Sequence, residues 1–239
     1  MGAKSKLACF DFETSGLDSK KNIVMEFAIV TSDQINFEPE VRYSELIKPY
    51  DVNGNSPIYE KKALEVHGIS LAETESKGET KEKFVQNCIK LFKNLNMTRN
   101  KHWSARPILC GHNVVFDVSF LIQIFKECGE DLTKHVLSNN DQIVVWDSLQ
   151  LSMQLHNNGS NDGFKYSLKD CFTREGFGEF MAHRALPDTE ATLKLIGALI
   201  NRMRGNSSKI KPNESISQEK SVGMEIRKSN RTKKEFFKF

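Results

Sequence analysis

Apolar positions along the chain follow two spacings, one typical of strands and one typical of helices. Three early segments, residues 7–14, 22–33 and 40–49, are rich in β-branched and aromatic side chains and are separated by turn residues. Because the separators are short, we expect these three strands to pair in an antiparallel meander. Two further apolar runs, residues 106–113 and 142–151, predict the remaining strands, and the second of them could continue into a helix.

Helical spacing replaces strand spacing in most of the other segments. Residues 80–95 carry apolar side chains three or four positions apart, and Pro187 stands near the start of a long periodic segment, where proline is tolerated. Strands followed by alternating helices and strands predict an α/β fold, with a mixed sheet and helices on both of its faces. The predicted helices span residues 57–68, 80–95, 114–129, 166–178 and 186–203.

The apolar pattern ends near Gly205, and the charge of the chain changes at about the same place. The net charge is +3, but residues 201–239 hold 11 Lys and Arg against 4 Asp and Glu, so the rest of the chain is net acidic. We therefore expect one domain over residues 1–204 and a basic, disordered tail over residues 205–239. The tail could grip a nucleic-acid backbone, act as a nuclear localisation patch, or simply be solvated.

The composition indicates where in the cell the protein is expected. The five cysteines are an odd number without a C-x-x-C pair, which argues for reduced thiols and against a disulfide framework or a zinc site. No segment approaches the roughly 18–20 apolar residues of a membrane span, and the first residues contain no secretory hydrophobic region. We expect an intracellular protein of the cytoplasm or nucleus, with no membrane partner.

Two acids interrupt the first apolar strand. Asp11 and Glu13 are two positions apart, so in a strand their side chains point to one face, while Phe10 and Phe12 point oppositely into a core. Neighbouring carboxylates repel each other, and a divalent cation such as Mg²⁺ or Mn²⁺ relieves that repulsion. The D-x-E pattern is common, however, and alone it more often marks a solvated strand end.

Two later segments hold further acids and histidines. Asp117 lies in the helix after an apolar strand, behind His112 and Asn113; alone it could be a surface residue, and Asn113 suits a helix N-cap. His183 and Asp188 are five positions apart, so they do not share a helix face. We expect His183 in a loop, where it could act as a general base, and Asp188 in a first helical turn, where the helix dipole favours an acid in any case.

These segments occur in the order DFETSGLD, GHNVVFD and HRALPD, and in that order they resemble the three motifs of the DEDDh (DnaQ-like) family of 3′–5′ exonucleases. Weaker matches lie between them, namely LEVHGIS, VVWDSLQL and SLKDCFTREGF. The resemblance covers roughly residues 6–200. It implies an RNase-H-like fold, a five-stranded mixed sheet whose first three strands are antiparallel, with helices on both faces, in agreement with the strand pattern.

The resemblance also implies a chemistry. Asp11, Glu13, Asp117 and Asp188 would hold two Mg²⁺ or Mn²⁺ ions, His183 would be the general base, and all five expected positions are filled. Two ions about 4 Å apart can activate an attacking water and stabilise the leaving 3′ oxygen. The implied enzyme hydrolyses DNA or RNA from the 3′ end, in single strands or at duplex ends, and releases nucleoside 5′-monophosphates.

For the substrate, the resemblance points to the turn after the first strand. Thr14, Gly16 and Leu17 would contact the 3′-terminal nucleotide, although a Ser-Gly pair equally favours a plain turn. His112 and Asn113 would support either the substrate strand or the turn of the second motif.

Two other functions stay open from the sequence. One is a nucleic-acid-binding or scaffold protein that keeps the fold with little catalysis, for which loss of an acid would be the usual sign. The other is a proofreading subunit associated with a polymerase, which co-purification with a polymerase would identify.

Overall fold

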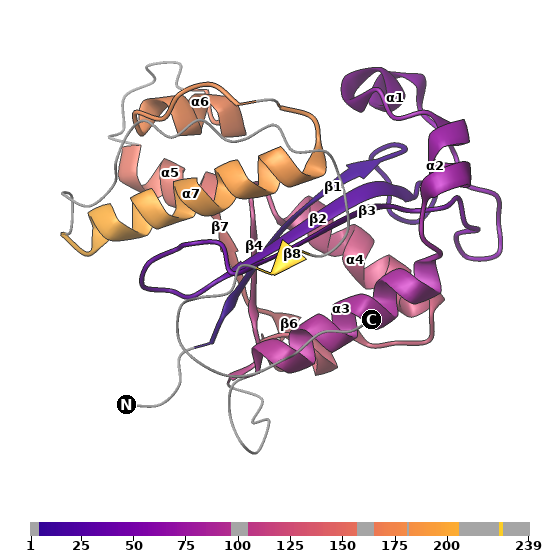
Figure 1. Cartoon of the computed structure of the whole chain (residues 1–239), viewed down its shortest axis with the longest axis horizontal. Coiled ribbons are helices and arrows are strands. Elements are labelled where there is room, and N and C mark those ends of the chain that lie inside the picture. Colours follow the sequence, from indigo (N-terminus) through magenta and orange to yellow (C-terminus); the bar gives the residue numbers. More distant parts are fainter. Residues whose placement is uncertain (1–4, 97–104, 157–164, 181, 206–224, 227–239) are drawn as a thin grey trace.

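The structure is a computed structural model in which residues 5–96, 105–156, 165–180, 182–205 and 225–226 are described. A mixed β-sheet crosses its centre, with the strand order β7-β4-β1-β2-β3-β8 (Figure 1). The first three strands are antiparallel, and β4 and β7 continue the sheet in parallel, which confirms the expected mixed sheet of five strands. The short strand β8 adds a sixth at one edge. The strands are β1 (Leu7–Thr14), β2 (Val24–Ser32), β3 (Val41–Leu46), β4 (Ile108–Gly111), β7 (Val145–Asp147) and β8 (Glu225–Ile226).

Helices cover both faces of this sheet, as expected. In Figure 1, α3 and α4 lie on one side of the strands, and α5, α6 and α7 lie on the other. The short helices α1 and α2 stand beyond the ends of β1, β2 and β3. The helices are α1 (Lys61–His67), α2 (Leu71–Lys77), α3 (Lys81–Leu95), α4 (Val115–Glu127), α5 (Ser148–His156), α6 (Leu168–Arg174) and α7 (Ala185–Met203).

The alternation of side chains along β1 divides the core into two layers. Phe10 and Phe12 are buried in the larger cluster, which the side chains of α3 and α4 complete. Cys9 belongs to a second cluster on the opposite face, which it shares with α7. Asp11 and Glu13 follow Cys9 in the same alternation, so the strand turns both acids toward α7.

Hydrogen bonds, more than the apolar pattern, determine where some elements begin and end. The helix predicted from residue 57 begins at Lys61, since the backbone N–H groups of Ile58 and Glu60 donate to carbonyl oxygens of the β1–β2 turn. The segment at residues 142–151 continues from a strand into a helix, as the sequence allowed: β7 ends at Asp147, whose carboxylate accepts the Leu149 N–H in the first turn of α5.

The sequence pattern did not predict the shortest elements. These are α2, the 3₁₀ turn η2 (Leu132–Lys134), the β5–β6 hairpin (Ser138–Asn139 with Gln142–Ile143) and β8. The strands of two residues are too short to display a periodicity, and α2 contains only two apolar residues, Leu71 and Ala72. β8 pairs antiparallel with β3 at the sheet edge. The rest of the predicted tail, and the loop at residues 157–162, lie outside the described residues. Within the described ranges, no helix is both long and apolar enough to span a membrane.

Candidate active site

Three carboxylates meet where the C-terminal half of β1 lies against the first turn of α7. Asp11 and Glu13 come from β1, and Asp188 comes from α7. Each side chain has one carboxylate oxygen that lies within 4.8 Å of an oxygen of each of the other two. The alternation in β1 and the packing of α7 across that face therefore bring together acids that are more than 170 positions apart in the sequence.

Burial raises the pKa of each acid in this group, and the charges of neighbouring carboxylates add to the shifts. Burial raises the pKa of Glu13 to about 8; the charges of Asp188 and Glu26 add to the shift, and Arg184 opposes it. Burial likewise raises the pKa of Asp188 to about 7. The pKa of Asp11 stands well above its usual range, through burial first and neighbouring carboxylates second. A positive charge placed among these groups would be strongly stabilising.

The donor set fits a divalent cation. The Oδ1 atom of Asp188 is buried and has no hydrogen-bond partner among the described residues, while its Oδ2 accepts the His183 N–H at 3.0 Å. An orphaned buried acceptor costs about 1–3 kcal/mol unless a ligand satisfies it. Carboxylate oxygens are the ligands that Mg²⁺ and Mn²⁺ prefer. Asp11, Glu13 and Asp188 are therefore the residues that could hold such an ion.

The fourth predicted acid, Asp117, stands beside this group and is not one of its three members. It lies in the first turn of α4 and is 4% exposed. Its Oδ1 accepts the backbone N–H of Phe12, at 3.2 Å, between the two acids of β1. Burial raises the pKa of Asp117 to about 8. Its charge in turn raises the pKa of Asp11, so the two carboxylates share one electrostatic environment.

His183 precedes α7 and is exposed, as expected for a residue in a loop. Its φ of +68° lies in the left-handed region, which costs a residue with a Cβ about 1–2 kcal/mol. The hydrogen bond from its backbone N–H to Asp188 helps to hold that conformation. Asp188 therefore holds the backbone of His183, while the side chain of His183 is exposed to solvent.

The turn after β1 is tightly fixed and ends in an exposed apolar side chain. A Cβ at Gly16 would lie 2.4 Å from the amide nitrogen of Asn22, a buried side chain that donates to the carbonyl oxygens of Ser15 and Ile58, so a larger residue would displace Asn22. The Thr14 hydroxyl donates to the Gly16 carbonyl oxygen at 2.8 Å. Leu17 is 76% exposed at the tip of the turn. An exposed leucine on a rigid turn beside the carboxylates is available to contact a substrate.

His112 is committed to contacts within the protein. Its Nδ1 lies 2.8 Å from the hydroxyl of Ser148, and its Nε2 lies 2.9 Å from the carbonyl oxygen of Tyr166. Burial lowers its pKa, so the ring is neutral at physiological pH. This geometry suits the supporting role expected for His112 more than a direct contact with substrate.

Asn113 lies in the turn before α4 and does not cap the helix; of the two roles open to it from the sequence, turn and cap, the structure supports the turn. The N-cap position is Val114, and Asn113 instead adopts a left-handed φ of +55° at the turn. Its backbone N–H donates to Asp147 at 2.9 Å, which ties the turn to the end of β7. Asparagine tolerates this backbone conformation better than most residues, so the position is explained by the turn.

Sequence reasoning missed two charged residues next to the carboxylates. Glu26 lies on β2 directly opposite Glu13 and is only 3% exposed. Arg184 follows His183 and pairs with Glu26 through its guanidinium. A single acid inside the apolar segment 24–30 was the available signal, but the same pattern fits a solvent-facing strand position.

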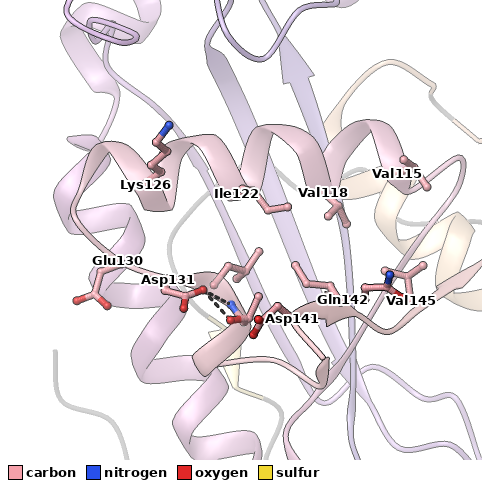
Figure 2. A pocket seen from close by; sticks show the side chains of 12 residues that line it. Val115, Val118, Ile122, Lys126, Glu130, Asp131, Asp141, Gln142 and Val145 are labelled. Atoms are coloured by element: carbon pink, nitrogen blue, oxygen red, sulfur yellow. Dashed lines mark hydrogen bonds between the residues drawn. The ribbon is translucent and has the colours of Figure 1, made fainter. Parts of the chain in front are cut away.

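A separate groove lies between α4 and the β5–β6 hairpin (Figure 2). It encloses about 620 Å³, and most of the surface that lines it is apolar. Figure 2 shows Val118 and Ile122 of α4 on one side, with Asp141 and Gln142 of the hairpin on the other. None of the carboxylates grouped at β1 and α7 lines this groove, so it is distinct from the candidate active site.

Comparison with known proteins gives matches over most of the chain. An exonuclease family model, RNase_T, matches residues 8–196. Ribonuclease T of Haemophilus ducreyi is 24% identical over 202 residues, which cover 81% of this chain and 84% of that protein. Ribonuclease T of Buchnera aphidicola subsp. Baizongia pistaciae is 27% identical over 204 residues, covering 81% and 83%.

Solved structures resemble the fold. A zinc-bound complex of E. coli exonuclease I with single-stranded DNA has a TM-score of 0.65 at 21% identity, and the match covers 86% of this chain and 42% of that chain. A complex of E. coli exonuclease I with a dT13 oligonucleotide has a TM-score of 0.65 at 22% identity, covering 84% and 42%. This chain therefore spans less than half the length of those exonuclease I chains.

Proposed function

Because the chain belongs to the exonuclease family whose model covers residues 8–196, we propose that it is a metal-dependent 3′–5′ exonuclease. In this proposal it hydrolyses the terminal phosphodiester bond of DNA or RNA and releases a nucleoside 5′-monophosphate. The observation that carries the proposal is the group of three carboxylates, with an orphaned oxygen on Asp188, next to the exposed His183.

Each polar residue has a distinct part in this proposal. Asp11, Glu13 and Asp188 would hold Mg²⁺ or Mn²⁺, and Asp117 would add a ligand for a second ion. A bound cation of this kind supplies Lewis-acid chemistry, lowering the pKa of water and neutralising charge on the phosphate. His183 would accept the proton of the attacking water at an imidazole nitrogen, for which its exposure and its link to Asp188 are favourable.

The proposed substrate is a free 3′ end of a single strand. The similar exonuclease I structures are complexes with single-stranded DNA or oligo-dT, and the similar proteins from Haemophilus and Buchnera are ribonucleases T, so both DNA and RNA are candidates. In this chain Leu17 would pack against the terminal base, and the rigid turn at Thr14 and Gly16 would fix its position. His112 and Asn113 would hold the neighbouring turn in place.

The proposed organisation is a catalytic domain over residues 1–204 and a basic tail over residues 205–239. The tail's charge favours a role in holding nucleic-acid backbone. Truncation after Arg204, assayed at two salt concentrations, tests that role: a smaller salt dependence supports it, and an unchanged rate and salt slope contradicts it. Five cysteines that form no disulfide support an intracellular location.

The catalytic proposal is tested with oligomers of DNA and RNA in Mg²⁺, and again in EDTA. Asp11→Asn and His183→Ala should each lower the cleavage rate by about 10²–10⁴-fold, because one removes a cation ligand and the other the proton acceptor. Glu82→Gln is the matched control, since Glu82 is an exposed acid of α3 outside the site, and it should cleave like the wild type.

Two results would contradict the proposal. Undiminished cleavage in EDTA would show that the reaction does not depend on a divalent cation. Near-wild-type cleavage by the Asp11→Asn variant in Mg²⁺ would show that the three carboxylates are not needed for cleavage. If the protein binds oligomers but cleaves none of them, in Mg²⁺ or in Mn²⁺, the result would instead favour a nucleic-acid-binding or scaffold protein.

A further inference from the structure

A partly buried ion pair joins β2 to the segment that carries His183. The guanidinium of Arg184 donates to both carboxylate oxygens of Glu26, from Nε at 3.0 and 3.2 Å and from Nη2 at 2.6 Å. The backbone N–H of Ala185 donates to the same carboxylate at 3.0 Å. The side chain of Glu26 is 4% exposed, and its carboxylate accepts hydrogen bonds from both a side chain and the main chain.

The contacts of Glu26 make up for a missing helix cap. Arg184 occupies the N-cap position of α7, but its side chain makes no capping hydrogen bond to the helix. The first N–H groups of a helix need acceptors from outside it. Glu26 supplies one from the neighbouring strand, at the position opposite Glu13 on β1. The start of α7 is therefore placed relative to the carboxylate group by a residue that belongs to neither β1 nor α7.

His183 lies directly before this anchored position and has an unfavourable backbone conformation. Its φ is +68°, and such conformations persist only where the surroundings hold them. Asp188 accepts the N–H of His183 on one side, and Glu26 holds Arg184 and Ala185 on the other. The chain direction at His183, and with it the direction of the imidazole, depends on both attachments.

We propose that the ion pair between Glu26 and Arg184 positions His183 for proton transfer. The inference rests on the proposed function, in which His183 accepts the proton of the attacking water. Arg184 and Glu26 are positioning residues in this account, since they act through the histidine and touch neither water nor phosphate. A planar guanidinium that binds both oxygens of a carboxylate fixes direction as well as distance, which lysine cannot do.

A competing role for Arg184 is direct binding of a substrate phosphate, because its side chain is 42% exposed. The two roles differ in the kinetic constant they affect. Loss of a phosphate contact weakens substrate binding and raises KM, whereas loss of positioning lowers kcat at nearly constant KM. A displacement of about 1 Å in a reacting group can cost roughly 100-fold in rate, so kcat is the sensitive measurement.

The test is a double-mutant cycle on kcat and KM with a single-stranded oligomer in Mg²⁺. Arg184→Met should lower kcat by about 10- to 100-fold and change KM by less than about 3-fold. In a His183→Ala background the same substitution should have no further effect on kcat, because the group that it positions is already absent. Arg184→Lys should give an intermediate kcat, since it keeps the charge and loses the planar fork.

Arg42→Met is the matched control. Arg42 on β3 pairs with Glu190 of α7, so the substitution removes an arginine–glutamate pair between the same sheet and the same helix, away from His183. It should leave kcat within about 2-fold of the wild type. If Arg184→Met does not fold, Glu26→Gln takes its place, since it keeps an acceptor for Ala185 and weakens the hold on Arg184.

The results separate this inference from the proposed function. If His183→Ala lowers kcat strongly and Arg184→Met multiplies that loss, the positioning role is overturned and the general base remains. A rise in KM alone for Arg184→Met overturns it in favour of phosphate binding. If His183→Ala cleaves like the wild type, the general base itself is wrong, and the positioning role falls with it.

Discussion

The Asp188→Asn substitution is expected to stabilise the cation-free protein by an amount that grows with pH. Asp188 shares its site with Asp11 and Glu13, and burial raises its pKa from 3.8 to about 7. Asparagine keeps an oxygen that can accept the N–H of His183, but it carries no charge. The substitution thus removes an ionisation that folding disfavours and retains the local hydrogen bond.

The size of the effect follows from the pKa in the two states. A carboxyl whose pKa is raised on folding contributes stability that is complete below its unfolded pKa, near 3.8, and is lost as the pH rises through its folded pKa. Each unit of pH in that interval corresponds to about 1.4 kcal/mol. From pH 5 to pH 7 the wild type should therefore lose about 3 kcal/mol relative to the variant, with little further change at pH 8.

Urea unfolding in EDTA at pH 5 and pH 8 measures this difference directly. Asp170→Asn is the matched control, because Asp170 is the first-turn acid of α6 and the substitution removes an acid that is not part of the carboxylate group. Added Mg²⁺ should reverse the order of stability, since only the wild type keeps all its ligands. An Asp188→Asn effect of equal size at both pH values would refute the reasoning.

Three further predictions concern the same end of the sheet. Binding of Mg²⁺ should release protons at pH 7 and tighten up to about pH 8, because the pKa of Glu13 is about 8; calorimetry in two buffers of different ionisation enthalpy measures the release. Gly16→Ala should lower the melting temperature by about 5 °C or more, since its Cβ would displace the buried, hydrogen-bonded side chain of Asn22. Leu17→Ala should raise KM about tenfold without changing the melting temperature, because this exposed side chain contributes to binding alone.

Each of these predictions has a control or a contrary outcome. Equal binding heats in the two buffers would show that no proton leaves and would contradict the raised pKa of Glu13. Gly178→Ala should be harmless, since a Cβ there meets nothing within 4 Å, and equal losses at both glycines would contradict the steric argument. Ile35→Ala, at another exposed apolar position, should leave KM unchanged, so an equal rise there would remove the special role of Leu17.

The parts of the fold that the sequence predicted are those that periodicity determines. Alternation along β1 was enough to predict that Asp11 and Glu13 share one face, because a strand has only two faces and Phe10 and Phe12 lie on the other, in the core. The antiparallel order of the first three strands followed from their short connections. By contrast, α2 and the β5–β6 hairpin depend on a few local hydrogen bonds, which the spacing of apolar residues does not indicate.

The site required information that spacing does not contain. Nothing in the sequence alone brings Asp188 to β1, because that contact arises from the packing of α7 across the sheet; it was expected only through resemblance to the exonuclease family, which the family match confirms. Glu26 was missed for the same reason. Its burial becomes evident only when Arg184, 158 positions later, is seen to pair with it.

The direction of cleavage tests the central claim most directly. A single-stranded oligomer with a 5′ label, incubated with Mg²⁺, should shorten one nucleotide at a time from its full length. The same oligomer labelled on its 3′-terminal nucleotide should release that label first, as a nucleoside 5′-monophosphate, and the Asp188→Ala variant should release none. Internal fragments, or early release of the 5′ label as a mononucleotide, would contradict a 3′–5′ exonuclease built on these carboxylates.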